Sequence, residues 1–328
     1  MRLGTRERRA PMAYLLFALG FVLLLKGADL LVEGGSALAR RFGVSELAVG
    51  LVVVSAGTSL PELVVNVFAS AEGSSELAIG NVLGSNIANV LLILGLSALI
   101  RALRIQDSTL LSEIPFSLTA MLLVAFLANA ALFNQGHILI ISRLDAAILL
   151  GFFALFLGYV YREFRRDGLS ARDPLGRGSA GAAFGRVSAG VVGLALGGHW
   201  VVDGALAVSA GLSVSESLVG LTIVAVGTSV PELAASGVAA YRGKADMAVG
   251  NVVGSNIFNL LWVLGVSGLI RPLSFDVVSN TDILMVIFSN VLLLVAVAIG
   301  RRNTIERWEG ALFLLVYGAY LTFVAIRG

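Results

Sequence analysis

The segment VSAGTSLPEL at residues 54–63 returns almost unchanged as VAVGTSVPEL at residues 224–233. A shift of 170 residues aligns the surrounding segment 44–101 with 214–271 without a gap, and 31 of the 58 positions are identical. Self-similarity at a fixed shift over this length indicates an internal duplication.

The composition is that of a protein whose solvent is lipid. Of the 328 residues, 57% are hydrophobic and only 13% are charged, whereas soluble domains have about 25% charged residues. A membrane-spanning helix needs about 20 apolar residues. The chain has no cysteine, which excludes disulfides, thiolate chemistry and Cys-based metal sites.

The apolar runs predict ten membrane-spanning helices. We place them near 12–34, 44–70, 78–100, 109–133, 139–161, 186–211, 214–240, 247–270, 278–299 and 306–326. Each copy of the repeat holds five spans, and an odd number places the second copy upside down relative to the first. The sequence therefore predicts an all-α integral membrane protein with ten transmembrane helices arranged as two inverted five-helix repeats.

The domain boundaries follow from the longest polar stretch, which is rich in Arg, Gly and Ser. The first five-helix repeat is expected at 1–161, a cytoplasmic linker loop at 162–185 and the second repeat at 186–328. The loops on one side carry fifteen Lys and Arg residues and the other side seven. Because cytoplasmic loops are rich in Lys and Arg, we expect a multi-pass protein of the inner or plasma membrane with both termini outside.

Glu62 and Glu232 lie in the middle of predicted spans, with long apolar stretches on both sides. A carboxylate inside a membrane is costly, so it faces the bundle interior and typically marks an ion path. Lys26 is the one cation within a predicted span, and it could pair with only one of the two glutamates. A bound metal ion is therefore the expected countercharge.

A proline precedes each glutamate, at positions 61 and 231. Proline lacks an N–H group and breaks or kinks a helix, which leaves the carbonyl groups around Thr58 and Thr228 without helical partners. In a membrane such carbonyls are tolerated where they line a cavity or coordinate an ion. Ser59 and Ser229 add hydroxyl groups.

The third and eighth predicted spans contribute GNVLGSNIAN (80–89) and GNVVGSNIFN (250–259). In each, an Asn, a Ser and a second Asn are spaced four residues apart and share one helix face. Asn89 and Asn259 lie deepest and are ligand candidates, whereas Asn81 and Asn251 have the positions of packing or capping residues. The glycines of the motif leave room for a neighbouring helix.

Several other acidic residues have simpler interpretations. Asp29 is expected to pair with Lys26 three residues earlier, and Glu113 to be solvated at a span end. The repeat partners Glu33 and Asp203 are candidates for an entrance vestibule.

All candidate ligands are oxygen atoms, which suit hard cations such as Ca²⁺. The two glutamates supply a formal charge of −2, which balances one Ca²⁺. Na⁺ is similar in size and also takes oxygen ligands. We find no nucleophile with a neighbouring base and no nucleotide loop, so an enzyme is not expected.

GTSLPEL with GNVLGSNIAN, and GTSVPEL with GNVVGSNIFN, resemble the two α-repeats of the cation/calcium exchanger superfamily, in particular its prokaryotic sodium/calcium exchangers. The resemblance implies alternating access, with Na⁺ entry driving Ca²⁺ extrusion and typically three Na⁺ per Ca²⁺. Sliding of the first and sixth spans across the rest would switch access. No cofactor is expected beyond the transported ions, and the chain is expected to work as a monomer in the bilayer.

The resemblance also assigns ligands. Glu62 and Glu232 would coordinate Ca²⁺ together with the carbonyl groups of Thr58 and Thr228. Flanking Na⁺ sites would use hydroxyl groups, and two amides would complete the centre; these residues are Ser59, Ser229, Ser85, Ser255, Asn89 and Asn259.

Two further expectations concern the ions. Potassium-dependent relatives carry an aspartate at the position of Asn259, so we expect transport that does not depend on K⁺. Calcium/proton relatives carry a glutamate in the GN motif, which this chain lacks. Ca²⁺/H⁺ exchange, with protonation of Glu62 and Glu232 replacing Na⁺, nevertheless stays open, as does exchange of another cation on the same site. A passive channel would more naturally build its pore by oligomeric symmetry, whereas this chain carries its own two-fold repeat, so a channel is disfavoured.

Overall fold

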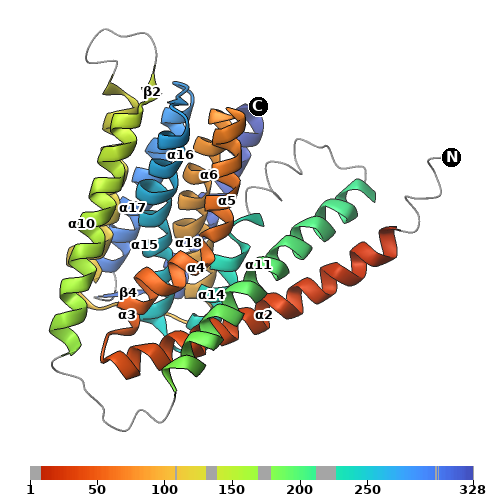
Figure 1. Ribbon diagram of the computed structural model, residues 1–328, viewed down its shortest axis with the longest axis vertical. Coiled ribbons are helices and arrows are strands. Elements are labelled where there is room, and N and C mark those ends of the chain that lie inside the picture. Colours follow the sequence, from red (N-terminus) through yellow and green to blue (C-terminus); the bar gives the residue numbers. More distant parts are fainter. Residues whose placement is uncertain are drawn as a thin grey trace.

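The computed structural model describes residues 9–107, 109–130, 139–168, 179–211, 227–299, 301 and 303–327. The first repeat contains α2 (Arg9–Phe42), α3 (Glu46–Val49), η1 (Gly50–Val54), α4 (Ser55–Thr58), α5 (Leu60–Glu72), α6 (Ser75–Ala88), η2 (Asn89–Leu94), α7 (Gly95–Ile100), η3 (Thr109–Glu113), α8 (Ile114–Ala128) and α10 (Arg143–Gly168). The second contains α11 (Ala180–Gly211), α14 (Val230–Tyr241), α15 (Ala245–Ile257), η5 (Phe258–Val263), α16 (Leu264–Ile270), α17 (Ser279–Ile299) and α18 (Arg307–Arg327). The η segments are π-helical turns inside longer helices. Most helices lie side by side in one bundle (Figure 1).

The predicted all-α membrane architecture is confirmed. Within the described residues, eight helices are long and apolar enough to cross a membrane, and the bent pair Glu46–Thr58 and Leu60–Glu72 makes a ninth span. The seventh predicted span is represented by α14, because residues 212–226 lie outside the described part of the chain.

Two short ladders show that the repeats are inverted. Strand β1 (Leu103–Arg104) pairs with β4 (Thr304–Ile305), and β2 (Ile140–Ile141) pairs with β3 (Leu273–Ser274), both antiparallel. Strand β1 follows the third span and β3 follows the eighth, so they are repeat equivalents. Figure 1 places β2 at the top of the molecule and β4 at the bottom, so equivalent segments lie at opposite ends.

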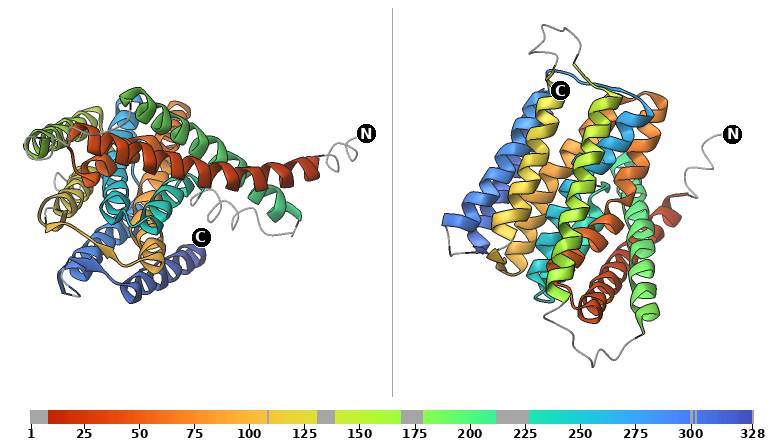
Figure 2. Two further views of the ribbon diagram at one scale, coloured as in Figure 1. Left: turned by 90° about the horizontal axis from the view of Figure 1, so that it is seen from below. Right: turned by 60° about the vertical axis from the view of Figure 1, so that its left-hand side comes forward.

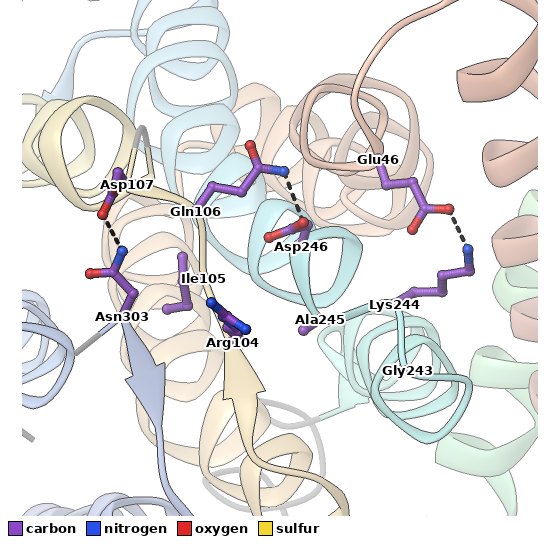
Figure 3. A pocket seen from close by; sticks show the side chains of 10 residues that line it. All are labelled: Glu46, Arg104, Ile105, Gln106, Asp107, Gly243, Lys244, Ala245, Asp246 and Asn303. Atoms are coloured by element: carbon purple, nitrogen blue, oxygen red, sulfur yellow. Dashed lines mark hydrogen bonds and ion pairs between the residues drawn. The ribbon is translucent and has the colours of Figure 1, made fainter. Parts of the chain in front are cut away.

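The end that carries β1 and β4 is the basic end of the molecule, because described basic residues of its loops, such as Arg104 and Lys244, lie there. Lys244 Nζ lies 2.5 Å from Glu46 Oε1, and Gln106 Nε2 donates to Asp246 Oδ2 at 2.9 Å (Figure 3). These residues line a cavity of about 700 Å³. A cavity of about 620 Å³ at the other end is lined by the repeat-equivalent segments, which is further evidence of inversion.

Helices α2 and α11 form an antiparallel pair that runs obliquely to the other helices (Figure 2). A Cβ atom on Gly27 would lie 2.9 Å from the carbonyl oxygen of Gly190, and one on Gly197 would lie 2.8 Å from that of Gly20. Gly20 and Gly190 are repeat equivalents, as are Gly27 and Gly197, so the contact obeys the two-fold symmetry. Glycine lets the two backbones touch, which suits helix packing in lipid.

Helix α15 packs in the same close manner against the first half of the second span. A Cβ atom on Gly254 would lie 2.4 Å from the carbonyl oxygen of Leu51, and one on Gly250 would lie 2.7 Å from that of Leu47. The predicted role of these two glycines is confirmed. For Gly80 and Gly84, the equivalent partners at 217–221 lie outside the described residues.

The structure differs from the sequence expectations at Glu113, at Asp29 and at the linker. Glu113 is only 2% exposed and accepts a hydrogen bond from Tyr159 at 2.7 Å, so the expectation of a solvated carboxylate was wrong. Asp29 pairs with Arg242 of the second repeat rather than with Lys26. Helices α10 and α11 extend into the predicted linker 162–185 from both sides, and residues 169–178 lie outside the described part.

Candidate cation site

The second span is broken where the motif GTS-x-PEL predicts a break. Helix α4 ends at Thr58, α5 begins at Leu60, and the two parts of the span meet at 46°. Ser59 lies between them outside helical geometry, with φ −83° and ψ 6°. Pro61 stands in the first turn of α5, where its missing N–H costs nothing to that helix but leaves the preceding turn without a donor. Ser229 has φ −88° and ψ 5°, so the break is repeated in the seventh span.

Glu62 and Glu232 occupy the first turns of α5 and α14, and both are fully buried. The N-terminal end of a helix carries a partial positive charge, which favours a carboxylate there. That partial charge does not neutralise a full negative charge in a dry interior. Each carboxylate therefore still requires a cation or a proton.

The two half-sites interlock across the repeat boundary. Ser59 Oγ of the first repeat donates to Glu232 Oε1 of the second at 3.1 Å. Ser59 is the residue that precedes α5, and Glu62 lies in the first turn of that helix, so the two carboxylates belong to one polar centre. The sequence prediction that two distant motifs form one site is supported by this contact.

The threonines of the motif are anchored by asparagines of the other repeat. Thr58 Oγ1 donates to Asn251 Oδ1 at 3.1 Å, and Thr228 Oγ1 donates to Asn81 Oδ1 at 3.3 Å. The asparagine amides continue the chain: Asn251 Nδ2 donates to Ser236 Oγ at 2.9 Å, and Asn81 Nδ2 donates to Asn66 Oδ1 at 2.7 Å.

Spans three and eight place four further predicted side chains in the interior. Ser85, Asn89, Ser255 and Asn259 are each at most 1% exposed. The π-helical turns η2 and η5 begin at Asn89 and Phe258, and such turns are frequent at functional sites. Asn89 Nδ2 donates to Asn256 Oδ1 at 3.0 Å, which fixes the amide group and leaves its oxygen available.

Buried polar atoms without a hydrogen-bond partner gather on the predicted residues. Among the described residues they include atoms of seven of the ten: both oxygens of Glu62, Oε2 of Glu232, Oδ1 of Asn89, both amide atoms of Asn259, and Oγ of Ser85, Ser229 and Ser255. An unsatisfied buried polar group costs about 1–3 kcal/mol, and more when it is charged. Most of these atoms are oxygens, so the donor set fits a hard cation.

The structure thus brings most of the sequence-predicted set into one interior region. Nine of the ten residues are buried, and Thr228 is half-buried at the edge of the described part. Sequence reasoning missed Asn66 and Ser236, and it assigned Asn81 and Asn251 to packing or capping only. The signal was present, since Asn66 and Ser236 are repeat equivalents and both are polar within an apolar span.

Comparison with known proteins gives the same result at the level of the family. The model of the family described as "Sodium/calcium exchanger protein" matches residues 12–162 and 183–326. The chain is 35% identical over 319 residues to the putative antiporter CaxA of Alkalimonas amylolytica, covering 92% of this chain and 95% of that protein. It is 31% identical to the sodium/calcium exchanger MaX1 of Methanosarcina acetivorans, covering 94% and 97%. A solved structure of the sodium-calcium exchanger NCX_Mj, soaked with Na⁺ and Ca²⁺, superimposes with a TM-score of 0.77 at 32% identity, covering 97% of this chain and 98% of that one.

Proposed function

The chain belongs to the sodium/calcium exchanger protein family and is a membrane cation antiporter, and we propose that it exchanges Na⁺ for Ca²⁺. Na⁺ influx drives Ca²⁺ extrusion by alternating access, with three Na⁺ for each Ca²⁺. The chain works as a monomer, with its basic end in the cytoplasm and both termini outside.

The observation that carries the proposal is the pair of fully buried carboxylates, Glu62 and Glu232, joined across the repeats by Ser59. Their charge of −2 balances one Ca²⁺, while the hydroxyl, amide and carbonyl oxygens around them offer ligands to Na⁺. Asn89 and Asn259 are neutral, so these two glutamates supply all the proposed centre's formal charge.

The proposal is tested by Ca²⁺ uptake into reconstituted vesicles with imposed gradients. Vesicles loaded with Na⁺ and diluted into Na⁺-free buffer should take up Ca²⁺, because outward Na⁺ movement drives the exchange. Three Na⁺ against one Ca²⁺ moves one net charge, worth about 2.3 kcal/mol per 100 mV. Because this net positive charge leaves the vesicle as Ca²⁺ enters, an inside-positive potential of 100 mV should raise Ca²⁺ accumulation by about 50-fold at equilibrium.

The same vesicles test the competing ions. A pH gradient of equivalent size should not replace the Na⁺ gradient, and Ca²⁺ uptake driven by the pH gradient alone would establish Ca²⁺/H⁺ exchange instead. Equal K⁺ on both sides should leave Na⁺-driven uptake unchanged, since neither Asn89 nor Asn259 is a carboxylate. A several-fold stimulation by K⁺ would contradict that part of the proposal.

A further inference from the structure

Asn251 joins three parts of the proposed cation site through one side chain. Its Oδ1 accepts from Thr58 Oγ1 at 3.1 Å, and its Nδ2 donates to Ser236 Oγ at 2.9 Å and to the backbone oxygen of Glu232 at 3.4 Å. Asn251 is 1% exposed, so water does not substitute for these contacts. The side chain therefore ties the broken span of the first repeat to the carboxylate-bearing turn of the second.

The repeat-equivalent residue, Asn81, makes a corresponding chain of hydrogen bonds. Asn81 accepts from Thr228 and donates to Asn66, and Asn66 Nδ2 donates to the backbone oxygen of Ala78 at 3.0 Å. On the other side, Ser236 Oγ donates to the backbone oxygen of Ala248 at 3.4 Å, and Ala78 and Ala248 are repeat equivalents. Both chains therefore run from a motif threonine to the same backbone position.

Resting on the proposed function, we infer that Asn251 and Asn81 are positioning residues for the transported cations. They do not need to touch the ion. Each holds the threonine of the other repeat at a fixed place, and with it the carbonyl group that we propose as a ligand. The pair thereby makes the geometry of each half-site depend on the other repeat.

The test is the Ca²⁺ concentration for half-maximal uptake. Asn251→Ala should raise it by about 10-fold while the maximal rate stays within about twofold, because binding geometry and not the conformational change is impaired. Thr58→Val, which keeps the carbonyl group, should have a similar effect. The double variant should be no worse than Asn251→Ala alone, since Asn251→Ala already removes the contact with Thr58.

The control is Asn290→Ala. Asn290 is also 1% exposed and accepts a cross-repeat hydrogen bond from Ser117 at 3.2 Å, but it lies outside the proposed site. Asn290→Ala should leave the Ca²⁺ concentration for half-maximal uptake unchanged. An equal shift in Asn290→Ala, additive effects in the double variant, or unchanged affinity in Asn251→Ala would each overturn the positioning role alone. Absence of cation-driven uptake by the unmodified protein would overturn the proposed function and the positioning role with it.

A second observation, independent of the cation site, concerns the contact between α2 and the turn after α14. Arg242 pairs with Asp29 and, at 3.2 Å, with Glu33, both on α2. This contact lies at the basic end. It ties the oblique α2–α11 pair to the rest of the bundle.

The repeat equivalents of these residues cannot make the same contact. Arg242 corresponds to Glu72, and Asp29 corresponds to His199, whose imidazole carries no permanent positive charge. In an inverted repeat, the alternative conformation exchanges the arrangements of the two repeats. The contact between Arg242 and Asp29 would then be replaced by one between Glu72 and His199 at the opposite end.

The geometry points to a one-sided latch formed by Arg242, Asp29 and Glu33. It holds the described conformation, in which α2 is tied to the basic end. In the opposite conformation the place of Arg242 is taken by Glu72, an anion. The latch therefore biases the equilibrium between the two conformations.

The test uses the absence of native cysteines, which makes one introduced thiol unique. Ser36 lies on α2 and is 4% exposed, so Ser36→Cys should react slowly with a water-soluble maleimide. Adding Arg242→Gln should raise the alkylation rate about threefold, the effect of losing a partly exposed ion-pair cluster. The pair Glu72→Arg and His199→Asp builds the mirror latch and should also raise the rate.

The matched control is Lys244→Gln. Lys244 lies in the same turn and is 34% exposed, against 32% for Arg242, but it pairs with Glu46 of α3 rather than with α2. It should not change the alkylation rate. Equal acceleration by Lys244→Gln, or none by Arg242→Gln, would overturn the latch. Because no transport is measured, this result does not depend on the identity of the transported ions.

Discussion

Glu62→Gln and Glu232→Gln are each expected to abolish Na⁺-driven Ca²⁺ uptake. Either change leaves one negative charge for a divalent cation that has lost its water. Removing one partner of a buried ion pair costs about 3–5 kcal/mol, which corresponds to a loss of more than about 100-fold in affinity. The initial rate of ⁴⁵Ca²⁺ uptake into vesicles, at a Ca²⁺ concentration near half-saturation of the unmodified protein, measures the effect.

Glu309→Gln is the control for this prediction. Glu309 is 2% exposed, and its Oε2 accepts a hydrogen bond from the backbone N–H of Glu306 at 2.7 Å, at the start of α18. It is as buried as the two site glutamates but has a structural partner, so its glutamine variant should transport Ca²⁺. Near-normal uptake by Glu62→Gln or Glu232→Gln would show that the carboxylates do not hold the ion.

Gly254→Ala is expected to lower the melting temperature by at least about 10 °C, or to prevent accumulation of folded protein. Its Cβ atom would lie 2.4 Å from the carbonyl oxygen of Leu51 and 2.7 Å from Ser55 Oγ. The first of these atoms belongs to the backbone of the second span, so relief requires that span and α15 to separate. Thermal unfolding in detergent, followed by size-exclusion chromatography, measures the loss.

Gly151→Ala provides the comparison, because among the described residues no atom beyond its chain neighbours and its own helix backbone lies within 4 Å of the position its Cβ would take. Alanine is a better helix former than glycine by about 1 kcal/mol, so this variant should be as stable as the unmodified protein or slightly more stable. If Gly254→Ala unfolded at the same temperature as Gly151→Ala, the close approach of α15 to the second span would be wrong.

The sequence predicted the architecture because duplication leaves a pattern that one chain can show by itself. The GTS-x-PEL motifs gave the helix breaks, since proline acts on its own turn and needs no knowledge of distant residues. The buried position of Glu62 and Glu232 followed from the apolar residues around them. These are local consequences of sequence.

What could not be predicted depends on contacts between elements. Nothing in the sequence shows that Asn251 meets Thr58, because that contact requires the relative placement of two spans from different repeats. Glu113 looked solvated because it is near a span end, but Tyr159 of α10 covers it. Asp29 had a suitable partner three residues away in Lys26, yet a residue more than two hundred positions later pairs with it instead.

The two short ladders have a mechanical consequence. Strands β1 and β4 join the loop after the third span to the loop before the tenth, and β2 and β3 join the loop before the fifth span to the loop after the eighth. Each ladder connects the two repeats, one at each end of the helical bundle. Helices α2 and α11 have no such brace among the described residues. We therefore expect the braced helices to stay together during transport, and the glycine-packed pair α2–α11 to move against them once the Arg242 contact is released.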